Sequence, residues 1–307
     1  MAKAGKWVLL ILLLLGGALV AVSTPDLPVE ELKRAYATGS SRFIELDGLS
    51  VHYRDEGQGP PLVLLHGTGA SLHTWDAWSS ALASHHRVIR MDLPGFGLTG
   101  PDPKSDYSIP AFVSFVDSFC KKLGLTRFAL AGNSLGGQIA WNLAVAHPEQ
   151  VTDLILLDPA GYPIARPALI FRLARIPVLS SLLTHADPGA MVKKTLRDAY
   201  GDQSKVTPAL IDRYRRLSLR AGNRDAFVAR VKQSPVDRTA DLPHVAARTL
   251  ILWGREDRLI PVAHAERFAK AIPGAKLIVY DSVGHLPMEE IGERSAADAE
   301  AFLTAAK

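Results

Sequence analysis

The chain has 307 residues, of which 48% are hydrophobic and 21% are charged, with one cysteine and a formal net charge of +4 at pH 7. This composition predicts a folded protein with a sizeable core, and it excludes a disordered chain and a scaffold held by intramolecular disulfides. Because lysine and arginine are interleaved with aspartate and glutamate and form no basic run, we expect no binding to nucleic acid.

The first predicted element is an N-terminal membrane anchor or signal segment, residues 1–24. Lys3 and Lys6 precede an uncharged apolar run over residues 7–22, and acidic residues follow it. As a helix this run would be about 24 Å long, which is short for the roughly 30 Å of bilayer hydrocarbon but long for the apolar part of a signal peptide. We expect a transmembrane signal anchor with the folded domain extracytoplasmic. The alternative is cleavage after Ser23, which would leave a secreted or periplasmic protein.

Eight short apolar runs rich in β-forming residues come next and predict eight strands. They cover residues 43–46, 51–53, 62–65, 87–91, 128–131, 154–157, 250–253 and 277–280. The first two are joined by Asp47-Gly48 and predict a hairpin. Helix-length segments separate the later runs, so we expect crossover connections and a largely parallel sheet with helices on both faces.

Between residues 161 and 240 the strand pattern stops, and helical patterning interrupted by prolines replaces it. This block predicts an inserted helical lid between two parts of a core, residues 40–160 and residues 241–307. Apolar residues punctuated by arginines between positions 165 and 184 suit either a helix at a lipid interface or the wall of an apolar pocket. We favour the pocket wall, because lid helices must turn apolar side chains toward the sheet.

The main chemical motif is Gly-Asn-Ser-Leu-Gly, residues 132–136. It follows a predicted strand and precedes a helix. In that setting Gly-x-Ser-x-Gly makes a turn so sharp that only glycine fits two residues on either side of the serine. The turn would present Ser134 as a nucleophile at a helix N-terminus. Taken alone, the same pattern also fits a plain glycine-rich turn.

A serine hydroxyl needs a base to take its proton, and the base needs an acid that fixes its tautomer. Asp257 lies just beyond the seventh predicted strand and His285 lies in the loop after the eighth. We therefore predict a catalytic triad of Ser134, Asp257 and His285. Asp158, which follows the sixth strand, is a reserve candidate for the acid, although Pro159 favours a turn there.

The sequence His-Gly-Thr-Gly, residues 66–69, follows the third predicted strand. Its small residues would let the backbone pass close to the serine, so that the amides of Thr68 and Leu135 form an oxyanion hole. His66 is then a structural histidine rather than the base, and we expect it to bond to nearby loop backbone.

Together with Asp-Leu-Pro-Gly-Phe-Gly at residues 92–97, these motifs resemble the α/β-hydrolase superfamily from about residue 43 to residue 302. The resemblance implies a mostly parallel eight-stranded α/β-hydrolase sheet with helices on both faces and an inserted helical lid. It also implies a serine hydrolase that acts through an acyl-enzyme on Ser134.

Within the superfamily, residues 133–137 and 253–255 resemble the branch that holds carbon–carbon bond hydrolases of aromatic ring-cleavage pathways and related esterases. Those carbon–carbon hydrolases usually carry a longer loop with a Pro-Gly step, which residues 69–71 lack. The departure favours hydrolysis of a carboxylic ester with a small, apolar acyl substrate. The alternatives are carbon–carbon bond hydrolysis, cofactor-free perhydrolase or acyltransferase chemistry on the same triad, and a non-catalytic ligand-binding module.

A competing motif is Gly-Phe-Gly-Leu-Thr-Gly, residues 95–100, which matches the dinucleotide-binding fingerprint. Pro101 and Pro103 follow at once, where that fingerprint needs a helix, so we reject a dinucleotide site. The sequence contains no Gly-x-x-x-x-Gly-Lys-Ser/Thr segment, and its histidines show no metal-ligand spacing. We therefore expect neither a cofactor nor a metal.

Overall fold

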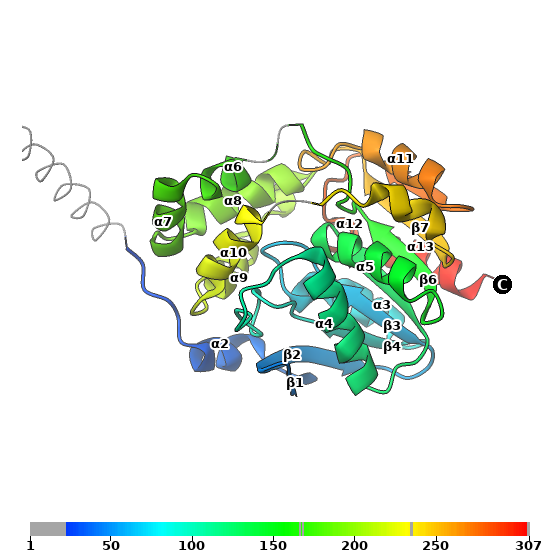
Figure 1. Cartoon of the computed structure of the whole chain (residues 1–307), viewed down its shortest axis with the longest axis horizontal. Coiled ribbons are helices and arrows are strands. Elements are labelled where there is room, and N and C mark those ends of the chain that lie inside the picture. Colours follow the sequence, from blue (N-terminus) through cyan, green and yellow to red (C-terminus); the bar gives the residue numbers. More distant parts are fainter. Residues whose placement is uncertain (1–22, 166, 168, 234–235, 306–307) are drawn as a thin grey trace, which may run out of the picture.

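The computed structural model describes residues 23–165, 167, 169–233 and 236–305 of the chain. At its centre is an eight-stranded sheet with the strand order β1-β2-β4-β3-β5-β6-β7-β8 (Figure 1). The strands are β1 (Ser41–Leu46), β2 (Leu49–Glu56), β3 (Pro61–Leu65), β4 (Arg87–Met91), β5 (Phe128–Asn133), β6 (Val151–Leu157), β7 (Arg248–Gly254) and β8 (Lys276–Tyr280). β2 runs antiparallel to β1 and to β4, and the other pairings are parallel. The mostly parallel eight-stranded sheet is therefore confirmed.

The four neighbouring strands β3, β5, β6 and β7, each paired in parallel on both sides, are buried along nearly their whole length. A parallel strand that is covered by helices on both faces needs such a continuous hydrophobic run rather than an alternating one. The predicted hairpin is also present. Asp47 and Gly48 both have positive φ, 52° and 81°, and form the two-residue turn that joins β1 to β2.

Helices cover both faces of the sheet, as predicted. Successive strand residues enter different core clusters, as Val63 and Leu64 do, because side chains alternate between the faces. Trp141 is buried with the first face and Trp78 with the second. The helices on the first face are α4 (Ile109–Lys122), α5 (Leu135–Ala146) and α11 (Ala263–Ala271), and those on the second are α3 (Asp76–Leu82), α12 (Pro287–Glu290) and α13 (Gly292–Thr304).

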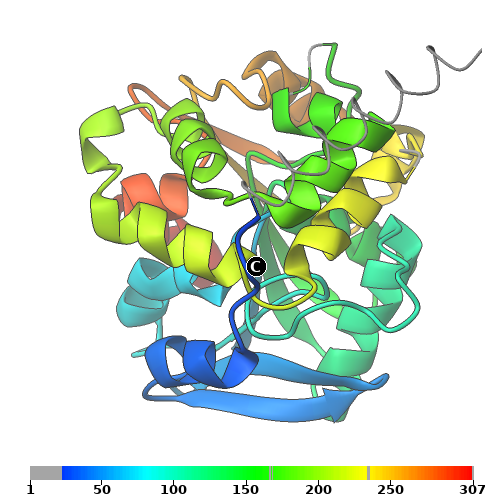
Figure 2. The same cartoon turned by 90° about the vertical axis from the view of Figure 1, so that its left-hand side faces the viewer.

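A group of five helices lies between β6 and β7 in the chain, on one side of the sheet (Figures 1 and 2). These are α6 (Leu169–Ala174), α7 (Pro177–His185), α8 (Gly189–Ala199), α9 (Pro208–Ser218) and α10 (Asn223–Lys232). The remaining helices of the described residues are α2 (Val29–Tyr36) and the short 3-10 helices η1 (Leu72–Trp75), η2 (Gln203–Lys205) and η3 (Thr239–His244). The block between β6 and β7 is thus helical. Its action as a lid and the domain boundaries drawn around it stay predictions.

The apolar residues predicted in α6 and α7 are divided between two environments. Phe171 and Leu183 pack against α10. Leu169, Ile176 and Leu182 are exposed at the surface of the helical group. The predicted apolar stripe is therefore partly used for packing between neighbouring helices and partly open to solvent.

Residues 23–28, which we name the N-terminal strap, cross the helical group before α2 begins (Figure 2). The amide of Thr24 donates to a carbonyl at the end of α7, and the amide of Leu27 donates to a carbonyl just after α9. The buried guanidinium of Arg224 on α10 donates to the carbonyl of Thr24 at 2.8 Å and to the carboxylate of Asp26 at 2.7 Å. The strap therefore connects three helices of the group.

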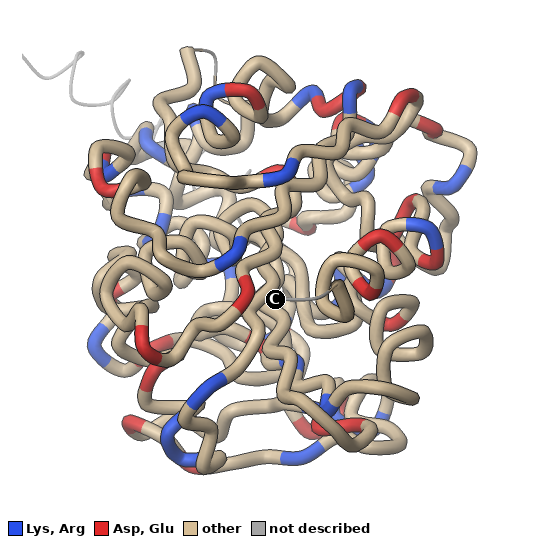
Figure 3. Tube along the Cα trace, turned by 90° about the vertical axis from the view of Figure 1, so that its right-hand side faces the viewer, with Lys and Arg blue, Asp and Glu red and all other residues tan. Residues whose placement is uncertain are grey.

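Basic and acidic residues are interspersed over the face seen in Figure 3. Many of them form local ion pairs, such as Arg87 with Asp55 at 2.8 Å and Lys194 with Asp198 at 2.6 Å. The charge pattern in space therefore follows the mixed pattern in the sequence.

The predicted membrane attachment is corrected by the structure. In the ranges of the chain described above, no helix is long and apolar enough to span a bilayer. The longest described helix, α4, has 14 residues, and a helix of that length would cover about 21 Å of the roughly 30 Å of hydrocarbon. The apolar run over residues 7–22 lies outside the described residues. A transmembrane signal anchor, and the extracytoplasmic location inferred from it, are therefore not supported.

Candidate active site

Ser134 occupies a strained turn between β5 and α5. Its φ is 54° and its ψ is −115°, a backbone conformation that residues with a side chain rarely adopt. A Cβ atom on Gly132 would collide with the backbone of Gly136, and a Cβ atom on Gly136 would collide with the backbone of Leu65. Both glycines are therefore required by close backbone approach, as the Gly-x-Ser-x-Gly motif predicts.

Asp257 and His285 form a buried pair at the ends of neighbouring strands. Asp257 follows β7, His285 follows β8, and the Nδ1 atom of His285 lies 2.6 Å from Oδ2 of Asp257. The other carboxylate oxygen of Asp257 accepts from the amides of Leu259 and Ile260, at 2.7 and 2.9 Å. Because the carboxylate accepts, Nδ1 is the donor, and Nε2 of His285 is left as the acceptor that a general base needs.

Asn133, the residue before the serine, links the serine turn to the histidine loop. Its buried amide nitrogen donates to the carbonyl of His285 at 2.9 Å and to the carbonyl of Leu157 at 3.1 Å. In the described residues, the side chain of Asn133, and not the hydroxyl of Ser134, forms the hydrogen bond between the serine turn and the histidine loop. Sequence reasoning quoted Asn133 only as part of a motif and missed this function, because the contact joins residues 152 positions apart.

The loop that begins at His66 passes directly against the serine turn. A Cβ atom on Gly67 would lie 2.9 Å from Oδ1 of Asn133 and 3.1 Å from Cβ of Ser134. Thr68 follows Gly67 in this loop, and Leu135 follows Ser134 as the first residue of α5. Their action as an oxyanion hole stays a prediction.

His66 is bonded to loop backbone at both ring nitrogens. The amide of Leu93 donates to Nε2 at 3.0 Å, so Nδ1 carries the proton and donates to the carbonyl of Gly67 at 2.8 Å. Burial lowers the pKa of His66, so the ring is held neutral. The expected bonding of His66 to nearby loop backbone is confirmed.

Asp92 explains Gly97, one of the glycines that resemble a dinucleotide fingerprint. This carboxylate is fully buried, pairs with His52 at 2.7 Å and accepts from the amides of Leu72 and Leu98. The nearby histidine charge and hydrogen bonds hold the pKa of Asp92 below its usual range despite burial. A Cβ atom on Gly97 would collide with the Asp92 carboxylate. The glycine there makes room for a structural acid.

Glu290 in α12 is a second residue that sequence reasoning missed. Its buried carboxylate accepts from the amide of Gly284, next to the histidine, and from the amides of Gly201 and Asp202, which follow α8. Neither a motif nor a strand end marks Glu290 in the sequence. One acid therefore joins the histidine loop to the helical group.

Asp158, the reserve acid, also lies at this site. One oxygen of Asp158, one oxygen of Asp257 and one ring nitrogen of His285 all lie within 4.8 Å of one another. Such a cluster has the donor atoms for a cation, but Nδ1 of His285 is already bonded to Asp257. Asp158 itself does not bond to His285, so the structure pairs the histidine with Asp257.

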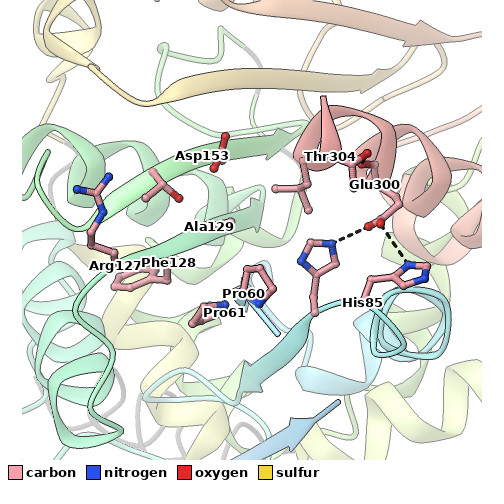
Figure 4. Close-up of a pocket in the computed structure, with 12 residues that line it drawn as sticks. Pro60, Pro61, His85, Arg127, Phe128, Ala129, Asp153, Glu300 and Thr304 are labelled. Atoms are coloured by element: carbon pink, nitrogen blue, oxygen red, sulfur yellow. Dashed lines mark hydrogen bonds and ion pairs between the residues drawn. The ribbon is translucent and has the colours of Figure 1, made fainter. Parts of the chain in front are cut away.

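A cavity of about 690 Å³ lies away from this site, at the opposite ends of β3, β5 and β6 (Figure 4). Pro61 and Phe128, the first residues of β3 and β5, line it, whereas Ser134 follows the last residue of β5. His85 and His86 lie against Glu300 there, at 3.2 and 2.7 Å. The cavity is therefore separate from the serine, aspartate and histidine described here.

Comparisons with known proteins identify the family. Residues 60–290 match the alpha/beta hydrolase fold. The chain is 30% identical over 277 residues to 2-hydroxymuconate semialdehyde hydrolase of Pseudomonas putida, covering 86% of this chain and 94% of that protein. It is 28% identical over 267 residues to 2-hydroxy-6-oxo-6-phenylhexa-2,4-dienoate hydrolase of Burkholderia cepacia, covering 80% and 90%. The crystal structure of a bacterial membrane phospholipase A is similar with a TM-score of 0.75 and 29% identity, covering 99% of this chain and 98% of that one. The chain is therefore a hydrolase that belongs to the alpha/beta hydrolase family.

Proposed function

We propose that this protein is a serine hydrolase that cleaves a bond beside a carbonyl carbon through an acyl-enzyme on Ser134. The observation that carries the proposal is the strained backbone of Ser134, with φ of 54° between β5 and α5. Strain of this kind persists where surrounding structure enforces it, and it is common at functional sites. The hydrogen-bonded pair of Asp257 and His285 at the same end of the sheet supports the proposal.

In the proposed reaction, Nε2 of His285 takes the hydroxyl proton as Oγ of Ser134 attacks the carbonyl carbon. Asp257 accepts from Nδ1 and stabilises the imidazolium that forms. The amides of Thr68 and Leu135 donate to the negative charge that develops on the carbonyl oxygen. His285 then gives its proton to the leaving group, and a water molecule releases the acyl group from the serine by the same steps in reverse.

Two bond types fit this chemistry, and they differ in the atom that receives the proton from the histidine. The names of the two curated relatives support hydrolysis of a carbon–carbon bond better than hydrolysis of an ester. The absence of a Pro-Gly step at residues 69–71 and the similarity to a phospholipase A support an ester. We propose carbon–carbon hydrolysis of a 2-hydroxy-6-oxo-dienoate first and ester hydrolysis second.

A fluorophosphonate probe tests the nucleophile. Wild-type protein is expected to be labelled at Ser134, and Ser134→Ala is expected to lose the label while remaining folded. Ser118→Ala is the matched control, because Ser118 is also half-buried but lies on α4, away from the site. Labelling that persists in Ser134→Ala would remove the proposal.

A substrate comparison then decides between the bond types. The same preparation is assayed on a 2-hydroxy-6-oxo-dienoate, by the loss of its absorbance, and on aryl esters of graded acyl length. Higher kcat/KM on the dienoate supports carbon–carbon hydrolysis, and higher kcat/KM on the esters supports the second proposal. Adding alcohols or peroxide to the ester assay shows whether water is the preferred acceptor of the acyl group.

A further inference from the structure

Asp158 is a buried acid that the proposed reaction does not use. It follows Leu157, the last residue of β6, and its side chain has no exposure to solvent. Its φ is 44°, which a residue with a side chain rarely adopts. The surrounding structure therefore holds the backbone of Asp158 in an unfavourable conformation.

The two oxygens of Asp158 differ in their surroundings. Oδ1 accepts from the amide of Gly254 at 2.9 Å. Oδ2 is buried and has no hydrogen-bond partner if both acids at the site are carboxylates. One oxygen of Asp257 lies within 4.8 Å of one oxygen of Asp158. Two carboxylates at this distance, away from water, are not both ionised, so one of them holds a proton.

Hydrogen bonds decide which acid is protonated. Asp257 accepts from three N–H groups, those of Leu259, Ile260 and the ring of His285, and all three stabilise its charged form. Asp158 accepts from only one, the amide of Gly254. The proton therefore belongs on Asp158, where it gives the orphaned oxygen a partner.

The other titratable groups near Asp158 act in the same direction. Glu290 adds negative charge, and Tyr280 on β8 is neutral. Burial raises the pKa of Asp158 well above its usual range, and the charge of Asp257 raises it further. The hydrogen bond from the amide of Gly254 acts in the opposite direction.

We infer that Asp158 is a neutral carboxylic acid that donates a hydrogen bond to Asp257 and thereby positions the Asp257–His285 pair. Its importance for turnover rests on the proposed function, because it acts on the pair and does not touch the substrate. The hydrogen bond fixes the rotation of the Asp257 carboxylate and draws negative charge away from the oxygen that faces the imidazole. Asp158 is thus a positioning residue.

Two substitutions separate a neutral Asp158 from an ionised one. Asp158→Asn keeps the shape, an acceptor for Gly254 and a donor for Asp257, so we expect kcat within about twofold of wild type and an unshifted acid limb of the kcat/KM profile. Asp158→Ala removes the donor, so we expect kcat to fall roughly tenfold with little change in KM. Its acid limb should move to higher pH, because an unshared Asp257 charge holds the imidazolium proton more strongly.

An ionised Asp158 would give a different pH profile. Asp158→Asn would then remove a negative charge beside the imidazolium, and its acid limb would move to lower pH. That result overturns the inference. Asp117→Asn is the matched control, because Asp117 is a largely buried acid on α4 that pairs with Lys121 and lies away from the site. Thermal denaturation of each variant separates a loss of fold from a loss of positioning.

An infrared difference spectrum measures the proton without any turnover. At neutral pH the wild-type minus Asp158→Asn spectrum should contain the C=O stretching band of a protonated carboxylic acid, shifted in D₂O. If the band is present and no substrate is turned over, the inference on protonation stands and the proposed function fails. If the band is absent, the inference fails whatever the enzyme hydrolyses.

Discussion

The backbone amide of His285 donates a hydrogen bond to the carbonyl of Ala199 at 2.6 Å, so the histidine loop is attached to the last residue of α8. The approach is so close that a Cβ atom on Gly284 would collide with the same carbonyl. Glu290 accepts from the amide of Gly284 on one side of this junction and from the amide of Gly201 on the other. The placement of the predicted base therefore depends on the helical group as well as on the sheet.

Glu290→Ala should lower both stability and turnover. The substitution leaves three N–H groups without their acceptor, and that of Gly284 is buried, where an unsatisfied donor costs about 1–3 kcal/mol. Because the histidine loop is then free to move, kcat should fall more than KM changes. Thermal denaturation and steady-state kinetics measure the two effects. Glu293→Gln, an exposed acid on the following helix, serves as the control. Wild-type kcat in a destabilised Glu290→Ala would show that the junction does not position His285.

Ser134→Gly should be inactive and yet more stable than wild type. Glycine adopts the observed φ of 54° without strain, whereas alanine does not. We expect Ser134→Gly to gain about 1 kcal/mol in free energy of unfolding and Ser134→Ala to gain none. Chemical denaturation of both inactive variants makes the comparison. Equal stability of the two would mean that the turn is not strained.

Asp257→Asn should reduce kcat by about 10⁴-fold, because an amide facing Nδ1 favours the wrong tautomer of the imidazole. His285→Ala should lose several orders of magnitude. The activity of the wild type should rise with pH as the imidazole loses its proton. These rates are measured on the substrate with the highest kcat/KM. If Asp158→Asn were more damaging than Asp257→Asn, the acid would have been misassigned.

The raised pKa of Asp158 predicts a dependence of stability on pH. Above about pH 4 the unfolded chain releases this proton while the folded protein keeps it. The stabilisation is therefore fully present below the unfolded pKa and is lost as the pH rises toward the folded pKa. Asp158→Asn has no such proton. As the pH rises through this window, the free energy of unfolding of Asp158→Asn should increase relative to that of the wild type by about 1.4 kcal/mol per pH unit. Denaturant titration at several pH values measures this difference. A constant difference between pH 4 and pH 8 would contradict the prediction.

Much of this site follows from local sequence. The strand ends place Ser134, Asp257 and His285 on one edge of the sheet, because parallel strands align their carboxyl ends. Each prediction depends on a pattern of a few neighbouring residues. The glycines around the serine are required by contacts within the same turn and with β3.

The junctions between distant segments could not be predicted in this way. Glu290 meets Gly201 across 89 positions, and Asn133 meets His285 across 152. Such pairs are set by how the helical group packs on the sheet, and no spacing in the sequence encodes that packing. Asp158 was correctly placed at a strand end, but its closeness to Asp257 depends on the packing of two strand ends in space.

The N-terminal strap limits where the chain can be shortened. A protein trimmed to begin at Asp26 would lose the amide and carbonyl of Thr24, and one trimmed to begin at Val29 would leave Arg224 without Asp26 as well. The buried guanidinium of Arg224 would then lose its anionic partner, which is strongly unfavourable in a desolvated setting. Shortened versions for crystallisation or assay should therefore start at or before Ser23. Proteases that cut within the strap would release it from α7 and α10, while Arg224 would still bond to the carbonyls of His185 and Ala186.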